Sequence, residues 1–186
     1  MSPKTKQEIS VIRLSERAYR DLRITTHCCL VTRAFGGKRI FLDSEVDAGI
    51  GKTVENINRE FGGDFRVEYE KNLYGKIKQL KKEGNVIVHL TMYGQAPVNT
   101  VMTKLKKAKK VTIVIGSEKV PGDVYHTADY NISITRQPHS EVASLAVFMH
   151  RLNEGKEEKM EFEGAKKKVV PMEHGKRVER VNGLNG

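Results

Sequence analysis

The sequence predicts an α/β protein in which helices cover both faces of a parallel sheet, and three observations support that prediction. Short runs rich in β-branched residues alternate with segments whose apolar residues recur at helical spacing. The most hydrophobic run, Val111–Ile115, is typical of a strand that is buried on both faces. The 186 residues, of which 38% are hydrophobic, suffice for one compact core.

The first half of the chain alternates strands and helices. The glycine pairs Gly36-Gly37 and Gly62-Gly63 mark helix ends, because glycine readily adopts the left-handed conformation that follows a helix. Ser15 and the polar segment after it open a further helix or helical turn, and an acidic loop covers Asp43–Asp47. The expected strands are 8–14, 39–42 and 65–69, and the expected helices are 24–35, 53–61 and 72–82.

The second half continues the alternation. A β-branched strand over 85–90 ends at a turn, Thr91–Gly94, and Pro97 lies in the first turn of the helix that follows. The apolar stripe of the last helix, which begins after Pro138, predicts that it packs on the sheet to about Leu152. The other expected elements are a helix over 97–107, a strand over 111–115 and a weaker strand over 130–134.

The alternation predicts one domain over residues 1–153 and a C-terminal extension over 154–186. In the extension, the runs Lys159–Phe162 and Lys168–Pro171 flank Gly164-Ala165, which predicts a β-hairpin arm with a frayed tail. We expect the arm to cross an interface between two copies of the chain.

The charge of the chain favours polyanionic partners such as nucleic acid. The formal net charge is +10 and the isoelectric point is about 9.6. Residues 1–40 hold nine basic against three acidic residues and residues 71–110 hold ten against one, whereas residues 41–70 hold three against eight. This segregation indicates two basic surfaces, although a lysine-rich helix face is often only solvated surface.

Several classes of protein find little support. No apolar run approaches the ~20 residues that cross a bilayer, and the start of the chain lacks the apolar segment of a secretory signal, so we expect a cytoplasmic protein without a membrane partner. The adjacent Cys28 and Cys29 suit burial better than a disulfide, and the six histidines follow no metal-binding pattern, so we expect no metal. The phosphate-loop interpretation of Gly49–Thr53 fails because Val46 stands where that motif begins with glycine.

Candidate binding residues follow the strands. Loops that leave the carboxyl ends of parallel strands form the ligand crevice of such folds, which selects Leu90–Gly94, Gly116–Val120 and Ile132–Ser140. Arg33 lies in an apolar helical stretch, where it either faces a partner or substrate phosphate or extends to water from an edge.

Four blocks of sequence together resemble one family. They are RDLRITTHCCLVTRAFG (20–36), HLTMYG (89–94), VIGSEKVP (114–121) and YNISITRQPHSEVASLAVF (130–148). In order and spacing they resemble the archaeal tRNA cytidine 2′-O-methyltransferases, which belong to the SPOUT class. The resemblance implies a C-terminal deep trefoil knot, a homodimer and S-adenosylmethionine bound between three loops.

The resemblance also implies roles for particular residues. Arg33 matches the catalytic arginine of ribose-methylating SPOUT enzymes, and Glu118 and Ser140 match polar catalytic positions. His27 stands in place of an asparagine, and Ser140-Glu141-Val142 stands in place of Ser-Leu-Asn. Arg20, Arg23 and His27 are expected to bind RNA. The expected cofactor-binding residues are Leu90, Ile115, Gly116, Ser117, Glu118, Lys119, Ile132, Ser133, Ile134, Thr135, Arg136, Gln137, Pro138, His139 and Ser140.

The sequence therefore predicts S-adenosylmethionine-dependent methylation of the ribose 2′-hydroxyl of the T-loop cytidine, position 56 of tRNA. Two alternatives stay open: a noncatalytic RNA-binding α/β protein, and a relative that methylates a base.

Overall fold

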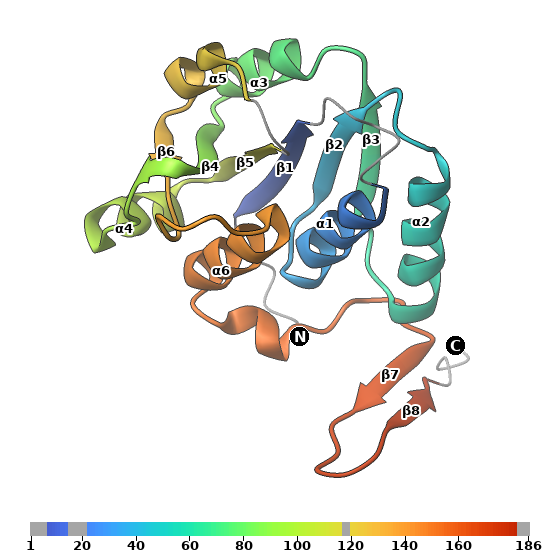
Figure 1. Cartoon of the computed structure of the whole chain (residues 1–186). Helices are drawn as coiled ribbons and strands as arrows, with labels where there is room; N and C mark the ends of the chain where they lie inside the picture. Colours follow the sequence, from blue (N-terminus) through green and yellow to red (C-terminus); the bar gives the residue numbers. More distant parts are fainter. Residues whose placement is uncertain (1–6, 15–21, 117–119, 182–186) are drawn as a thin grey trace.

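A computed structural model describes residues 7–14, 22–116 and 120–181 (Figure 1). The predicted helix at Ser15 lies outside these ranges. Among the described residues, no helix has both the length and the apolar composition needed to cross a membrane.

Six parallel strands form the main sheet, in the order β3-β2-β1-β5-β4-β6. The sequence of β1 explains its central place, because Ile9 and Val11 point to one face while Ile12 and Leu14 point to the other. At one end of the sheet, Leu14 lies opposite Gly116 of β5. The bounds are β1 Glu8–Leu14, β2 Arg39–Asp43, β3 Arg66–Glu70, β4 Val86–Gln95, β5 Lys110–Gly116 and β6 Tyr130–Ile132.

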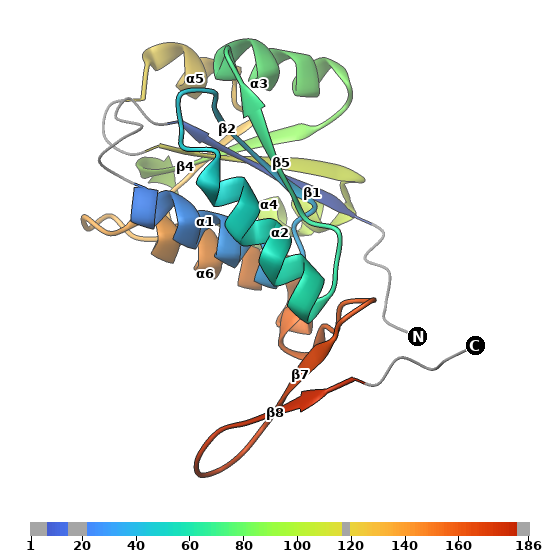
Figure 2. The ribbon, with the colours of Figure 1, turned by 90° about the vertical axis from the view of Figure 1, so that its right-hand side faces the viewer.

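Helices cover both faces of this sheet (Figure 2), as predicted. The larger core cluster packs α1, α2, α4 and α6 on one face, and the smaller cluster packs α3 and α5 on the other. The bounds are α1 Leu22–Ala34, α2 Gly49–Phe61, α3 Leu73–Lys82, α4 Asn99–Lys107, α5 Gly122–Thr127 and α6 Glu141–Asn153. The sequence did not predict the short α5.

Helix α2 begins four residues before the predicted Thr53. Two side chains hold this earlier start: the Asp47 carboxylate accepts the backbone N–H of Gly49 at 2.7 Å, and the Tyr69 hydroxyl accepts that of Gly51 at 3.2 Å. The glycines of the rejected phosphate loop therefore form the first turn of a helix, with two of their N–H groups already bonded.

Strand β4 does not end at Leu90, so the predicted turn at Thr91–Gly94 is wrong. Leu90 and Gln95 both pair with Ile132, and the residues between them bulge out of the ladder. Gly94 permits the return, because a Cβ there would lie 2.6 Å from the backbone of Asn131. The first predicted cofactor loop is thus a bulge whose two ends are fixed on β6.

The C-terminal extension contains a hairpin, in which one of the two predicted runs, Lys168–Pro171, forms a strand within one residue of the expected bounds and the other does not. Lys156–Lys159 forms a 3₁₀ turn, and the run Lys159–Phe162 forms no strand. Instead β7 (Lys167–Val170) pairs antiparallel with β8 (Arg177–Arg180), and Gly175, at φ +84°, supplies the left-handed residue of the connection. Figures 1 and 2 show this hairpin projecting from the body.

Candidate functional site

The strand ends that lead into the three predicted loops lie side by side at the carboxyl edge of the sheet, in the order β5-β4-β6. Gly116 ends β5, while the bulge of β4 and the start of the third loop share Ile132 as a neighbour. Gly116 has little space around it, because a Cβ there would clash with the side chain of Val120. The predicted residues Ser117, Glu118 and Lys119 lie outside the described part of the chain.

The third loop runs from a buried start to an exposed end. Ile132 and Ser133 are buried, Ile134 is half-buried, and the residues from Thr135 to Ser140 are exposed. The Ser133 hydroxyl donates to the Thr135 carbonyl at 2.7 Å, and the Ser140 hydroxyl caps α6 by accepting the Val142 N–H at 3.2 Å. Side chains therefore fix the loop at both ends.

A partly buried polar network around the buried His89 supports the first loop from the α5 side. His89 contacts the Asn131 amide oxygen through Nδ1 at 2.9 Å, and Asn131 donates to the Tyr125 carbonyl at 2.9 Å. The Tyr125 hydroxyl lies 3.2 Å from the hydroxyl of Thr91. Burial lowers the pKa of His89, so the imidazole is neutral near pH 7. No local pattern signals this network, because its members are isolated polar residues in the sequence.

A buried ion pair ties the end of β1 to the start of α6. Arg13, only 1% exposed, contacts Glu141 Oε1 through Nε at 2.8 Å and through Nη2 at 2.6 Å. Glu141 replaces the leucine of the Ser-Leu-Asn pattern and directly follows the third loop. The pair therefore fixes where that loop ends. The signal in the sequence was an arginine within an apolar strand, and it was missed.

The two cysteines are buried between α1 and the sheet, as expected. Burial raises the pKa of Cys28 and of Cys29 to about 12, so both are neutral thiols near pH 7. In the described ranges, no group of three or more potential ligands gathers to hold a metal ion.

Arg33 lies at the opposite end of α1 from the three loops. The N–H of Lys38, which follows α1, donates to Ile9 at the beginning of β1, so the helix ends at the amino edge of the sheet. At 1.5 Å per residue, Arg33 is roughly 16 Å along the helix from Leu22. The structure of one chain therefore does not bring Arg33 together with the predicted cofactor loops.

The surroundings of Arg33 are structural. Its guanidinium donates to Asn58 Oδ1 at 2.8 Å and to the Gly62 carbonyl at 2.5 Å, and it stacks over the Phe162 ring at 4.5 Å. Burial lowers the pKa of this guanidinium. These contacts join α1 to the end of α2 and to the C-terminal extension.

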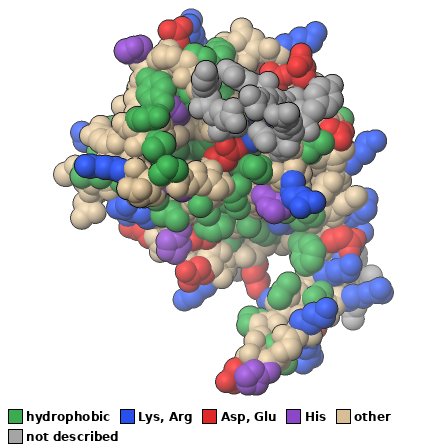
Figure 3. Space-filling model, in the orientation of Figure 1, with side chains coloured by type: hydrophobic (Ala, Val, Ile, Leu, Met, Phe, Trp, Pro, Cys, Tyr) green, Lys and Arg blue, Asp and Glu red, His purple; other side chains and the backbone are tan. Residues whose placement is uncertain are grey.

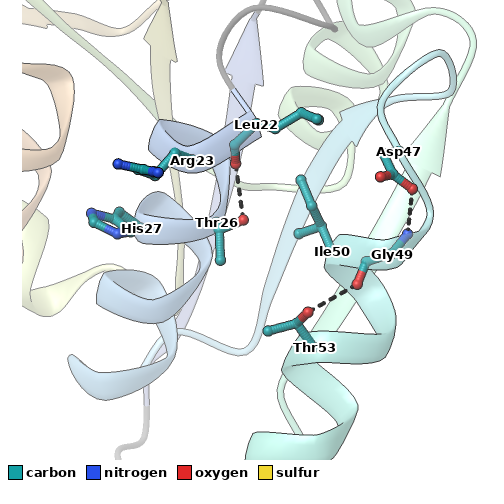
Figure 4. A pocket seen from close by; sticks show the side chains of 8 residues that line it. All are labelled: Leu22, Arg23, Thr26, His27, Asp47, Gly49, Ile50 and Thr53. Carbon is teal, nitrogen blue, oxygen red and sulfur yellow. Dashed lines mark hydrogen bonds between the residues drawn. The ribbon is translucent and has the colours of Figure 1, made fainter.

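The predicted RNA-binding residues Arg23 and His27 lie at the loop end of α1, in its first two turns. They are exposed and border a groove of about 490 Å³ between α1 and α2. Figure 4 shows both side chains side by side and pointing away from Ile50 of α2. Arg20 lies in the segment 15–21, which the structure does not describe.

The groove itself is a poor site for phosphate. Asp47 contributes a carboxylate to it, and Leu22 and Ile50 contribute apolar surface. The positive charge therefore sits on the outer side of α1, beside the groove.

Comparisons with known proteins place these features in context. A family profile described as tRNA ribose 2′-O-methyltransferase, aTrm56, matches residues 61–179. The chain is 48% identical over 170 residues to the tRNA (cytidine(56)-2′-O)-methyltransferase of Methanobrevibacter smithii, which spans 91% of this chain and 94% of that protein. It is 47% identical over 178 residues to the protein of the same name from Pyrococcus horikoshii, with 94% and 86% covered.

Solved structures share the fold at low sequence identity. The TrmH/SpoU tRNA modifying enzyme of A. aeolicus matches with a TM-score of 0.57 and 14% identity, over 84% of this chain and 78% of that one. An RNA 2′-O ribose methyltransferase matches with a TM-score of 0.58 and 14% identity, over 84% and 59%. The SpoU methyltransferase AviRb of Streptomyces viridochromogenes, in complex with AdoMet, matches at 0.51 and 11% identity, over 79% and 59%.

Proposed function

Because the chain belongs to the family of tRNA ribose 2′-O-methyltransferases, we propose that it methylates the 2′-hydroxyl of cytidine 56 in tRNA with S-adenosylmethionine as the methyl donor. The observation that carries the reaction is the 48% identity to the Methanobrevibacter enzyme over 91% of the chain. The choice of donor is supported by the methyltransferase family of the chain and by the AdoMet complex of its structural neighbour AviRb.

S-adenosylmethionine presents an apolar adenine ring and polar groups, and residues of the three loops can contact both. The half-buried Ile134 offers apolar surface for an adenine ring, while Leu90 and Ile132 are buried in the core and fix the loops beside it. The exposed residues from Thr135 to Ser140 offer polar groups for the edge of the ring and for the amino acid part of the donor. We propose that the donor is held there, with Ile115, Gly116, Ser117, Glu118 and Lys119 forming the second wall and with Arg136, Gln137, Pro138 and His139 in the third loop. When bound, the sulfonium supplies an electrophilic methyl group.

The protein must position the ribose 2′-hydroxyl, which is a weak nucleophile, and stabilise the negative charge that develops on its oxygen. With the donor bound, the 2′-oxygen would form a bond to the methyl carbon while the sulfur keeps the electron pair of the bond that breaks, and the hydroxyl proton would pass to the adjacent phosphate. An arginine is a poor base, so a nearby arginine acts by orienting the adjacent phosphate and stabilising the developing negative charge. We assign this role to Arg23 in place of Arg33, because Arg23 is exposed at the loop end of α1. Ser140 and Glu118 keep their predicted polar roles.

We propose that tRNA lies across the outer side of α1, where Arg20, Arg23 and His27 contact its backbone. The lysines of residues 71–110 provide further contacts, although they divide between α3 on one face of the sheet and α4 on the other. Lys76 and Lys81 are already paired with Glu70 and Asp129. The affinity for tRNA should fall steeply as salt is added.

Three further features belong to this proposal: the C-terminal deep trefoil knot, a cytoplasmic location and a homodimer. For the dimer, the supporting observation is apolar surface on α1 and α6, where Ile24 and Val147 are 42% and 43% exposed (Figure 3).

The deciding experiment is transfer of labelled methyl from S-adenosylmethionine to an unmodified tRNA transcript, followed by nucleoside analysis. Labelled 2′-O-methylcytidine is expected, and it should disappear when cytidine 56 is changed to uridine. Label on a base would establish the base-methylating alternative. Tight tRNA binding without transfer would establish the noncatalytic one.

A further inference from the structure

The hairpin of the C-terminal extension carries positive charge away from the body of the protein. We define the basic arm as residues 166–181, which contain β7, β8 and their connection. All residues from Pro171 to Val181 are exposed, so the arm adds almost nothing to the core. It holds six Lys and Arg residues against two Glu residues. Figure 3 shows these cationic side chains along the projecting segment.

The root of the arm is fixed. Lys166 donates its N–H to the Glu60 carbonyl at 2.9 Å, and the Lys167 ammonium lies 2.5 Å from the Glu60 carboxylate. The segment before the arm lies close to Gly62, where a Cβ would be 2.6 Å from the carbonyls of Phe162 and Glu163. Arg33 stacks on Phe162 and bonds to Gly62. The arm is therefore held in a defined direction and is not a loose tail.

Half of the six cations of the arm are compensated within the chain, because Lys167, Lys168 and Arg177 pair with Glu60, Glu161 and Glu179. Arg180 lies directly opposite Lys167 across the hairpin, a position in which like charges repel, although Glu60 offsets part of the charge of Lys167. Among the described residues, Lys166, Lys176 and Arg180 make no ion pair. A bound polyanion would neutralise these cations and remove the repulsion between them. The repulsion does not stabilise the hairpin itself, because an isolated two-stranded hairpin is only marginally stable in water.

These observations favour RNA as the occupant, and the inference rests on the proposed function. We propose that the basic arm binds the phosphate backbone of tRNA at a place remote from the methylated nucleotide. The arm leaves the amino edge of the sheet beside the end of α2, whereas the three loops leave the carboxyl edge. A folded tRNA is long enough to reach both, so the arm would supply affinity and orientation while the loops supply chemistry.

The test uses the full chain and two paired variants. Lys176→Gln with Arg180→Gln removes two unpaired cations while keeping polar side chains at both positions. Val169→Thr with Val178→Thr removes apolar surface from the same hairpin and keeps its charge; these valines are 60% and 54% exposed. Binding of unmodified tRNA is measured over a range of salt concentrations, together with S-adenosylmethionine affinity, melting temperature and sedimentation mass.

The Gln variant is expected to weaken tRNA binding several-fold near 0.1 M salt and to reduce the salt slope by roughly 1 for each phosphate that the arm no longer neutralises. Its S-adenosylmethionine affinity should equal that of the wild type, and its melting temperature should be no lower, because the change also removes the repulsion between Arg180 and Lys167. The Thr variant should bind tRNA as the wild type does.

Unchanged affinity and salt slope in the Gln variant would overturn the proposal. A loss of dimer mass in the Thr variant, with tRNA binding intact in the Gln variant, would show instead that the arm docks on a second copy of the chain. Because both readouts are independent of methyl transfer, failure of the arm proposal is distinguishable from failure of the proposed reaction.

Discussion

The two arginines of α1 have different roles: we propose that Arg23 contacts the tRNA, whereas Arg33 stabilises the fold. Replacement of Arg33 by alanine should lower stability by roughly 1–3 kcal/mol, because the buried Gly62 carbonyl loses its donor and Phe162 loses its stacking partner. Replacement of Arg23 by alanine should lower methyl transfer to tRNA with little change in stability. Melting temperature and single-turnover rates on both variants check this. A normal melting temperature with abolished transfer in Arg33→Ala would return the catalytic role to Arg33.

The buried cysteines make stability depend on pH in the alkaline range. Their thiols ionise near pH 9 when the chain is unfolded and near pH 12 when it is folded. Between these values the folded state retains protons that the unfolded state loses, so the contribution of the two thiols to stability is constant below about pH 9 and falls as the pH rises. The test is urea unfolding of the wild type and of the double variant Cys28→Ala with Cys29→Ala. From about pH 8 to about pH 10.5, the free energy of unfolding should decline less in the variant than in the wild type. Equal declines would show that other groups dominate.

At the scale of elements, the contact between β1 and α6 depends on the Arg13–Glu141 pair. Glu141→Ala leaves a buried arginine without that carboxylate and should cost about 3–5 kcal/mol. S-adenosylmethionine binding should weaken as well, because the end of the third loop is released. The double replacement Arg13→Met with Glu141→Leu should recover much of the stability and less of the donor affinity. If donor affinity recovers fully along with stability, the pair serves folding alone.

The sequence predicted those elements whose identity is local and missed those that depend on distant contacts. The apolar periodicity of 8–14, 24–35 and 111–115 was enough to place β1, α1 and β5. By contrast, the start of α2 depends on Tyr69 from another strand, and the return of β4 to Ile132 depends on the backbone of β6. Strand β8 has too few apolar residues to be recognised before its partner is known.

The same limit applies to the candidate site: the sequence indicates which strand ends lie together but not which distant side chains contact one another. The rule that ligands lie at the carboxyl ends of parallel strands selected three loops that share one edge of the sheet, because it needs only strand order. The distance of Arg33 from these loops could have been predicted, because Arg33 lies in the last turn before the helix end at Gly36-Gly37 and a helix between two parallel strands ends at the amino edge of the sheet. The Arg13–Glu141 and His89–Asn131 contacts join residues 128 and 42 positions apart, and local patterns do not record such distances.

For the whole molecule, the apolar surface of α1 and α6 predicts self-association. Val147→Asp should convert a dimer into a monomer, since a carboxylate cannot be buried there without a partner. Tyr74→Asp is the matched control, because Tyr74 is 36% exposed and lies on α3, which covers the other face of the sheet. Sedimentation of both variants measures the effect. A dimeric Val147→Asp variant would place the interface elsewhere.

The pairing of β1 with β5 also has a consequence for the newborn chain on the ribosome. Glu8 lies opposite Lys110, so the central pair of the sheet joins segments about a hundred residues apart. One edge of the apolar strand β1 stays without a partner strand until β5 has been synthesised and has left the exit tunnel. Partners so far apart in sequence find each other slowly, and exposed strand edges invite aggregation in the interval. Synthesis of this enzyme should therefore be sensitive to the supply of chaperones that shield a partly made sheet.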